Sequence, residues 1–241
     1  MNSNFDFSKT AFYSSIEGPC PYLNGVFEKK ILTELKGENA VVIYNILSRY
    51  GFRRSYNLCY TQVCDNCSNC IPIRVKVDDF KLTRSFKRVI SKNQNIKSFF
   101  KYPKASQEQF LIFQKYQNQR HQDGEMSQMD FEEYRSMMEE SPIDTQVLEL
   151  RTSKNKLYAL GICDILEDGL SAVYLFFDPS YEQQSPGTFT ILNMIEQTKK
   201  LGLKYLYLGF WVPKSDKMSY KSRFKPLEIL TPLGWLDLED V

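Results

Sequence analysis

The spacing of apolar residues predicts five helices. Over residues 33–49 they recur every three or four positions, so that Ala40, Ile43 and Leu47 share one side of a helix that Gly51 would end. The same period appears over residues 83–92, 108–119, 130–140 and 187–201. Asp130 is a suitable N-cap for the fourth helix, which supports its predicted start.

Stretches rich in β-branched, aromatic and other apolar residues predict the strands. They cover residues 55–63, 71–77, 145–151, 157–165, 170–177 and 205–210. Within 71–77, apolar residues alternate with Arg74 and Lys76, so one face of that strand is basic. Short polar turns separate the three strands between residues 145 and 177, which predicts that these strands follow one another in a sheet.

Together these elements predict a mixed α/β (α+β) protein with two domains. Residues 1–104 would form an α/β domain that holds most of the cysteines, and residues 105–241 a domain with a mostly antiparallel sheet. The second domain has helices, three antiparallel strands, a helix and another strand, an order that resembles acyltransferases of the GNAT class.

In GNAT folds, the helix after the third strand turns free backbone N–H groups toward an anionic acyl carrier. Here that helix would begin around Ser185, Gly187 and Thr188. The segment lacks the glycine- and arginine-rich pyrophosphate loop of enzymes that use acetyl coenzyme A. The sequence therefore favours an acyl donor carried on something larger.

Charge adds a second signal, because 31 basic and 29 acidic residues nearly cancel yet are sorted into blocks. Residues 74–104 include ten basic and two acidic side chains, and residues 199–225 eight basic and one acidic. Such blocks are either solvated faces or parts of a surface for a polyanion.

No apolar run approaches the roughly 20 residues of a membrane span, and Met1–Asp6 lacks the pattern of a signal peptide. We expect a cytoplasmic protein that binds neither membrane nor DNA.

Three of the six cysteines, Cys64, Cys67 and Cys70, form a Cys-x-x-Cys-x-x-Cys run. Thiolates at this spacing can reach one metal ion, and Cys20, in a proline-flanked turn, is the candidate for the fourth ligand. Four sulfurs suit either zinc or an iron–sulfur cluster; the alternative is four free thiols in loops. Cys59 lies in a predicted strand and Cys163 on an apolar stretch, and both are expected in the core.

Seven short motifs carry the most specific signal. In chain order they are Glu17-Gly18-Pro19-Cys20-Pro21-Tyr22-Leu23, Gly51-Phe52-Arg53-Arg54-Ser55, Cys64-x-x-Cys67-x-x-Cys70-Ile71-Pro72-Ile73-Arg74-Val75, Arg120-His121-x-Asp123-Gly124-x-Met126, Phe177-Asp178-Pro179, Tyr207-Leu208-Gly209-Phe210-Trp211-Val212 and Lys217-Met218-x-Tyr220-Lys221-x-Arg223-Phe224-x-Pro226-Leu227-Glu228. With them the chain resembles the arginyl-tRNA–protein transferase family from about residue 12 to 235. The resemblance is strongest to the bacterial branch, the aspartate/glutamate leucyltransferases.

The resemblance implies a reaction and its partners. The enzyme would move leucine from leucyl-tRNA to the α-amine of a protein that begins with Asp or Glu, which marks that protein for degradation by the N-end rule pathway. Since the ester on the tRNA is already activated, neither ATP nor coenzyme A would be needed. The family's GNAT-like C-terminal region agrees with the order of elements predicted above.

Four residues are candidates for the chemistry and for the acidic acceptor. Aminolysis requires an oriented neutral amine; Asp178 could orient or deprotonate it, with Glu228 as the alternative and a helix-entry cap as the other interpretation of Asp178. A guanidinium binds a carboxylate in bidentate fashion, so either Arg53 or Arg54 would bind the acidic first residue. A structural salt bridge is the competing role for both arginines.

The acceptor end of tRNA calls for positive charge interleaved with aromatic rings. Lys217, Tyr220, Lys221 and Arg223, expected in a loop, match this requirement. Two alternatives stay open: arginine as the donor, and a metal-containing RNA-binding module without catalysis. The bacterial cysteine spacing and the chain length favour leucine.

Overall fold

The chain divides into two compact units, one of residues 1–75 with 208–241 and the other of residues 76–207. The structure, a computed structural model, describes residues 7–122 and 124–240. The boundary predicted after residue 104 falls within the second unit, and the segment from residue 208 onward groups with the N-terminal residues. The start of the chain, residues 1–6, lies outside the described residues.

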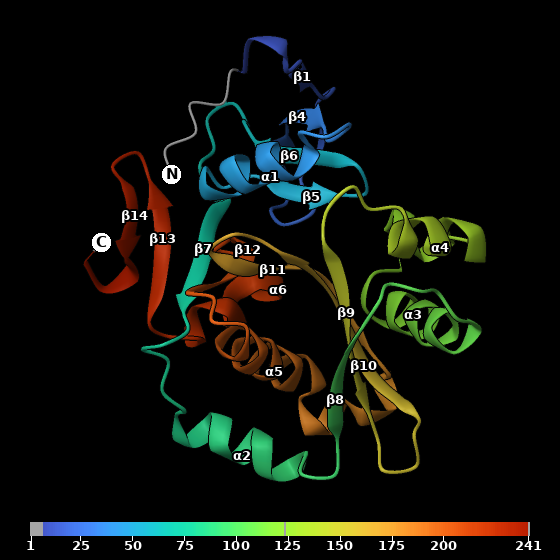
Figure 1. The fold of residues 1–241 in the computed structure, drawn as a ribbon. Coiled ribbons are helices and arrows are strands. Elements are labelled where there is room, and N and C mark those ends of the chain that lie inside the picture. The colour runs from blue at the N-terminus through green and yellow to red at the C-terminus, as the bar shows by residue number, and fades with distance from the viewer. Residues whose placement is uncertain (1–6, 123, 241) are drawn as a thin grey trace. The chain divides into compact units, whose positions relative to one another are not determined.

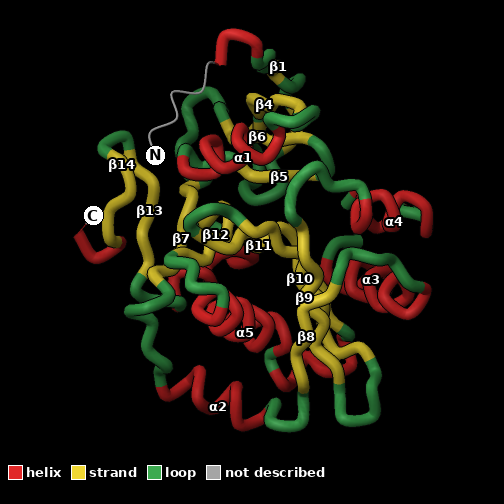
Figure 2. The backbone as a smooth tube through the Cα atoms, viewed as in Figure 1, coloured by secondary structure: helices red, strands yellow, loops and turns green. Residues whose placement is uncertain are grey.

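Consecutive antiparallel strands form the sheet of the second unit. They are β8 (Lys97–Lys101), β9 (Thr145–Arg151), β10 (Leu157–Ile165) and β11 (Gly169–Phe177). After a helix, β12 (Tyr205–Trp211) pairs in parallel with the beginning of β11 (Figures 1 and 2). The predicted α/β class and the GNAT-like order of strands and helix are confirmed.

Helices cover both faces of this sheet. They are α2 (Arg84–Lys92), α3 (Gln107–Arg120), α4 (Phe131–Glu139) and α5 (Pro186–Lys200), each within one residue of its predicted bounds. On β10, Gly161 faces Met194 of α5, whereas the neighbouring Leu160 belongs to a buried cluster with Phe113 of α3. Thus α5 lies on one face and α3 on the other (Figure 1). No helix within 7–122 and 124–240 is long and apolar enough to cross a membrane.

The first unit contains a smaller antiparallel sheet. Its order is β1 (Tyr13–Ser14), β4 (Lys30–Glu34), β6 (Leu58–Gln62), β5 (Arg53–Ser55). Further antiparallel pairs join β7 (Ile71–Lys76) to β13 (Leu227–Thr231), β13 to β14 (Gly234–Asp237), and β2 (Gly18–Pro19) to β3 (Phe27–Glu28). The remaining elements are α1 (Ala40–Arg49), α6 (Asp216–Ser219) and the 3₁₀ turns η1 (Phe7–Lys9), η2 (Glu125–Gln128), η3 (Pro179–Gln184), η4 (Tyr220–Arg223) and η5 (Leu238–Asp240).

Two predictions for the first unit are wrong in part. The helix expected over residues 33–49 begins only at Ala40, because its first two residues belong to β4 and Gly37 adopts a φ of 67° that interrupts a right-handed helix. The strand expected over residues 55–63 is a hairpin, since Tyr56 (φ 53°) turns the chain between β5 and β6. The first error comes from pairing of β4 with β6, which lie on either side of α1 in the sequence, and the second from a tight turn between two consecutive strands.

A buried carboxylate on β9 connects the edge strand β8 and helix α3 to the sheet. Glu149 accepts hydrogen bonds from Arg151 Nε at 2.7 Å and Gln109 Nε2 at 2.8 Å, and Lys101 Nζ lies 2.6 Å from its Oε2. Burial by itself raises the pKa of a carboxyl, but these three donors outweigh it and lower the pKa of Glu149 to about 2.

We expect Glu149→Gln to lower the free energy of unfolding by about 3 kcal/mol at pH 7. The folded-state pKa lies below the unfolded value of 4.5, so the carboxylate stabilises the fold above that value and loses this effect as the pH falls toward 2. Urea unfolding at pH 7 and pH 3 measures the difference, with the exposed Glu38→Gln as control. An equal loss at both pH values would contradict the ionic origin.

Candidate functional site

Basic and aromatic side chains in the first unit surround Arg53. Arg53 on β5 stands opposite Tyr60 on β6, so both side chains lie on the same face of the small sheet. The Tyr60 ring centroid lies 6.3 Å from that of Phe210 and 5.7 Å from Nζ of Lys30. Arg53 is only 9% exposed, so this face holds a nearly buried guanidinium beside aromatic rings.

The neighbouring arginine has a different environment. Arg54 points to the opposite face of the sheet, as alternation along a strand requires, and is 5% exposed. Its Nη1 donates to the backbone oxygen of Tyr56 at 2.7 Å, which holds the β5–β6 turn. The structure therefore separates two residues that the sequence could not rank.

Gly209 allows Arg53 to approach the backbone of β12. A Cβ at this position would lie 2.9 Å from Nε and 3.1 Å from Cζ of Arg53, and the residue has a φ of 76°. Both the contact and the left-handed backbone require glycine. A lone glycine inside a strand pattern is a sequence signal for such a close approach, and the sequence prediction overlooked it.

Lys221 lies beside the same glycine. Its Nζ donates to the carbonyl oxygens of Leu208 at 2.8 Å and Phe210 at 2.7 Å, the residues on either side of Gly209. Burial lowers the pKa of Lys221 to about 7, and the positive charge of Arg53 acts in the same direction. Near neutral pH much of Lys221 is therefore a neutral amine, which can donate two N–H groups to the carbonyls and still accept a proton.

The segment expected to be a loop around Lys221 is helical. Lys217 lies on α6, whereas Tyr220 and Arg223 lie on η4, and all three are exposed. Three residues per turn place Tyr220 and Arg223 on one side of η4, with Lys221 on the side of the buried Phe224. Lys221 is thus directed into the protein, whereas the other three predicted residues are exposed to solvent.

Both predicted catalytic carboxylates have structural partners. Glu228 on β13 faces Arg74 on β7, whose Nε lies 2.6 Å from its Oε2, and the Arg74 guanidinium lies 4.3 Å from the Trp235 ring centroid. Asp178 caps η3, where its Oδ1 accepts from Ser180 N at 3.0 Å. Asp178 therefore occupies the cap position that was its alternative interpretation.

The start of α5 provides backbone donors in the second unit. Ser185, with a φ of 57°, ends η3 and precedes α5, and the N–H groups of Gly187 and Thr188 have no partner within the helix. A Cβ on Gly187 would meet the ring of Phe177 at 3.6 Å, and the Tyr116 ring centroid lies 4.9 Å from that of Phe177. Backbone donors thus lie beside aromatic rings at this end of α5, and such donors are suited to an anionic group.

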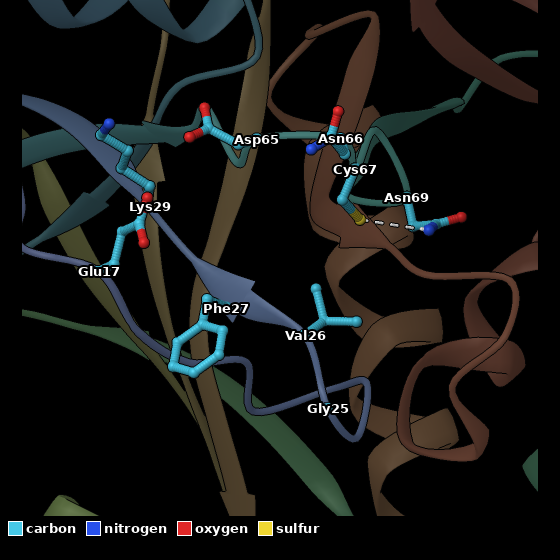
Figure 3. Close-up of a pocket in the computed structure, with 9 residues that line it drawn as sticks. All are labelled: Glu17, Gly25, Val26, Phe27, Lys29, Asp65, Asn66, Cys67 and Asn69. Carbon is cyan, nitrogen blue, oxygen red and sulfur yellow. Dashed lines mark hydrogen bonds between the residues drawn. The ribbon is translucent and has the colours of Figure 1, made fainter.

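The candidate metal ligands lie close together in the first unit. Cys64 Sγ accepts from Lys29 N at 3.4 Å, and Cys67 Sγ accepts from Asn69 Nδ2 at 3.3 Å (dashed in Figure 3). Burial, together with the three other candidate sulfurs, raises the pKa of Cys70 to about 12. Cys20, Cys64 and Cys67 therefore lie near enough to Cys70 to act on it electrostatically.

This cysteine loop borders an open cavity of about 410 Å³. Figure 3 shows its lining: Glu17, Gly25, Val26, Phe27, Lys29, Asp65, Asn66, Cys67 and Asn69. Among the described residues, no three Cys, His, Asp or Glu side chains converge tightly enough to hold an ion as they stand. Four sulfur donors on neighbouring loops nevertheless fit zinc or an iron–sulfur cluster in chemistry. Cys59 and Cys163 are buried, as predicted.

The site includes residues that the sequence prediction missed. Tyr60 and Lys30 join the Arg53 face only through pairing of β4, β5 and β6. Because cross-strand neighbours are set by register, their sequence positions alone carry no such signal. Asp123, part of the motif at residues 120–126, lies outside the described residues.

Comparison with known proteins assigns both parts of the chain to one family. The family description "Arginine-tRNA-protein transferase, N terminus" matches residues 18–88, and "Arginine-tRNA-protein transferase, C terminus" matches residues 108–231. A relative from Granulibacter bethesdensis, named aspartate/glutamate leucyltransferase, is 48% identical over 94% of this chain and 85% of its own. One from Gluconacetobacter diazotrophicus with the same name is 46% identical over 95% and 88%.

Among solved structures, L-PGS from Bacillus licheniformis is similar with a TM-score of 0.44 and 10% identity, covering 75% of this chain and 54% of that one. This likeness is too distant to support any conclusion. The two family matches leave residues 89–107 unassigned, and the boundary predicted after residue 104 falls in that interval.

Proposed function

Because the chain belongs to the arginine-tRNA-protein transferase family, we propose that it is an aminoacyltransferase that moves leucine from leucyl-tRNA to the α-amine of proteins beginning with Asp or Glu. The observation that carries this proposal is identity of 40–48% across nearly the whole chain to proteins named aspartate/glutamate leucyltransferase. The product would enter the N-end rule pathway in the cytoplasm. The activated ester makes ATP and coenzyme A unnecessary.

We assign to Arg53 the binding of the acidic first residue of the acceptor protein. Its nearly buried guanidinium lies on the same face as Tyr60 and as Lys30, whose Nζ is paired with Glu28 Oε1 at 2.6 Å. A carboxylate that leaves water for this face gains a charge-assisted, bidentate hydrogen bond. Arg54 is the weaker candidate because its side chain holds its own turn through Tyr56.

Lys221 is our candidate for the general base. In the reaction the α-amine nitrogen forms a bond to the leucyl carbonyl carbon, the bond from that carbon to the ribose oxygen breaks, and the amine loses a proton while the ribose oxygen gains one. A lysine with a pKa of about 7 is suited to accept that proton near neutral pH. Asp178 and Glu228 suit the role less well because a cap and an ion pair already engage them.

Each unit contains a set of groups that is by itself suited to the tRNA acceptor end. Lys217, Tyr220 and Arg223 expose charge and an aromatic ring along one helical segment, which suits terminal phosphates and bases. In the other unit, the free N–H groups at the start of α5, at Gly187 and Thr188, suit an anionic group.

The four cysteines would hold zinc or an iron–sulfur cluster. Cys20, Cys64, Cys67 and Cys70 supply sulfur ligands from the turn after β2 and the loop between β6 and β7. Such a centre would fix the two loops against each other. Metal analysis of the purified protein and of its Cys64→Ser variant tests this assignment without reference to activity.

The decisive experiment is transfer of radiolabelled leucine, and separately arginine, from charged tRNA to a peptide that begins with Asp. A peptide identical except for Ala at the first position is the control. We expect leucine on the Asp peptide only. Arginine on that peptide would keep the mechanism but change the donor, and transfer of neither by metal-loaded protein would favour a non-catalytic RNA-binding role.

A further inference from the structure

Helix α2 presents a strongly basic face to solvent. Residues 80–104 contain eight basic side chains and no acidic one. On α2 itself Arg84, Lys87 and Arg88 are exposed at the helical spacing of i, i+3 and i+4, whereas Phe86 and Val89 are buried. Within the part of the chain that the structure describes, no carboxylate forms an ion pair with any of these three cations.

This arrangement of charge works against the stability of the helix. The first turn of α2 contains Arg84 and no acidic residue, at the end where the helix dipole favours a negative charge by about 0.3–1 kcal/mol. Like charges at positions 84 and 88 repel each other by a further few tenths of a kcal/mol. Folding alone gives no reason for three adjacent cations here, so a polyanionic ligand is the simpler explanation.

The position of α2 relates its basic face to the start of α5. Asn93, the C-cap of α2, donates from Nδ2 to Gln184 O at 2.9 Å, and Lys92 Nζ donates to Gln183 O at 3.2 Å. Gln183 and Gln184 end the turn that precedes Ser185 and α5. A ligand whose end lies at the first turn of α5 can therefore continue along α2, which is about 13 Å long at 1.5 Å per residue.

We propose that the basic face of α2 binds the phosphate backbone of the double-stranded acceptor arm of the tRNA, an inference that rests on the proposed function. The exposed part of α2 carries charge without an aromatic ring, since Phe86 is buried. Single-stranded bases are held by stacking on such rings, whereas a duplex is bound through its phosphates. An anionic membrane fits less well, because the apolar side of α2 is packed against the protein and cannot insert.

The test is the triple variant Arg84→Gln/Lys87→Gln/Arg88→Gln. We expect its Kd for uncharged tRNA, and for a minihelix of the acceptor and T arms, to rise on the order of 10- to 100-fold near 0.1 M salt, with a slope of log K against log salt that is smaller by about 2–3. Binding of the single-stranded 3′ end alone should not change. In transfer assays the KM for leucyl-tRNA should rise, while kcat and the KM for the peptide stay constant.

The matched control removes the same charge elsewhere on the second unit. Lys115→Gln/Lys154→Gln/Lys156→Gln alters exposed lysines on α3 and on the β9–β10 turn and should leave both Kd and slope unchanged. The melting temperature of the α2 variant should equal or exceed that of the wild type, because repulsion is relieved. This result would exclude misfolding as the cause of weaker binding.

Three outcomes would be informative beyond the expected one. An α2 variant that binds minihelix with unchanged affinity and salt slope overturns the inference, even if the wild type transfers leucine. Loss of RNA binding in that variant, together with no transfer by the wild type, supports the surface and removes the proposed function. Unchanged RNA binding with lost sedimentation on phosphatidylserine vesicles would overturn the inference and assign the face to membranes.

Discussion

Replacing Arg53 by Met should lower kcat/KM for an Asp-initiated peptide by about 100-fold, since loss of a buried charge from an ionic hydrogen bond costs about 2–5 kcal/mol. Arg53 is nearly buried and lies against the backbone of Gly209, so little solvent reaches its guanidinium. The diagnostic measurement is the ratio of kcat/KM for peptides that begin with Asp and with Asn, which differ in charge but hardly in shape. Arg53→Met should erase that ratio and leave the KM for leucyl-tRNA unchanged.

The matched control for this prediction is Arg54→Met. It removes an equally buried guanidinium from the next residue, where the side chain holds the turn at Tyr56. We expect a loss of thermal stability with the preference for Asp over Asn retained. If Arg53→Met keeps that preference, or if Arg54→Met loses it, the assignment of the acidic residue to Arg53 is wrong.

Replacing Lys221 by Met should lower kcat by about 100-fold or more, the usual effect of removing a general base. With a pKa of about 7, Lys221 can accept a proton only above that pH, so wild-type kcat should rise as the pH increases through 7. In the Met variant, kcat should no longer rise as the pH passes 7. It should rise only where the peptide amine loses its proton, near pH 8.

A second variant separates the base from the structural contact. Lys221→Arg keeps N–H donors for the oxygens of Leu208 and Phe210 but does not titrate near neutral pH. Its permanent charge beside Arg53 should lower the free energy of unfolding, and the folded variant should lack the rise in kcat near pH 7. A wild-type pH profile in Lys221→Arg would leave Lys221 with a purely structural role.

The same lysine predicts how stability depends on pH. Its pKa falls from 10.5 to about 7 on folding, so between these values the unfolded chain binds more protons than the folded one. The free energy of unfolding should then rise with pH over this interval. Lys221→Met should flatten that rise, which chemical denaturation at pH 7 and pH 9.5 would measure.

Local sequence patterns predicted the second unit better than the first. Its helices and long strands show clear periodicity. Most of its paired strands also follow one another in the sequence with short turns between them, so local patterns predict both the elements and their neighbours. In the first unit, β4 pairs with β6 across α1, and β7 pairs with β13 across most of the chain. Such long-range pairing overrides local preference, which is why residues 33–39 were predicted to be helical.

The sequence by itself determined the family, the mixed α/β class, the cluster of candidate ligand cysteines and the basic block that contains α2. These features follow from residue types and their spacing, which can be read directly from the sequence. The sequence also predicted that Gly51 ends a helix. In the structure, a Cβ on Gly51 would lie 2.6 Å from Pro72 Cγ and 2.8 Å from Leu230 Cδ2, so packing also requires glycine at this position.

Only the tertiary structure decided which charged residues can act. Arg53 and Arg54 are equivalent in sequence, but strand alternation directs one toward Tyr60 and the other toward its own turn. Lys221 counted as one more exposed cation until the structure showed its amine bonded to carbonyls and close to Arg53. Burial and neighbouring charge set the chemistry of an ionisable group, and both come from residues far away in the sequence.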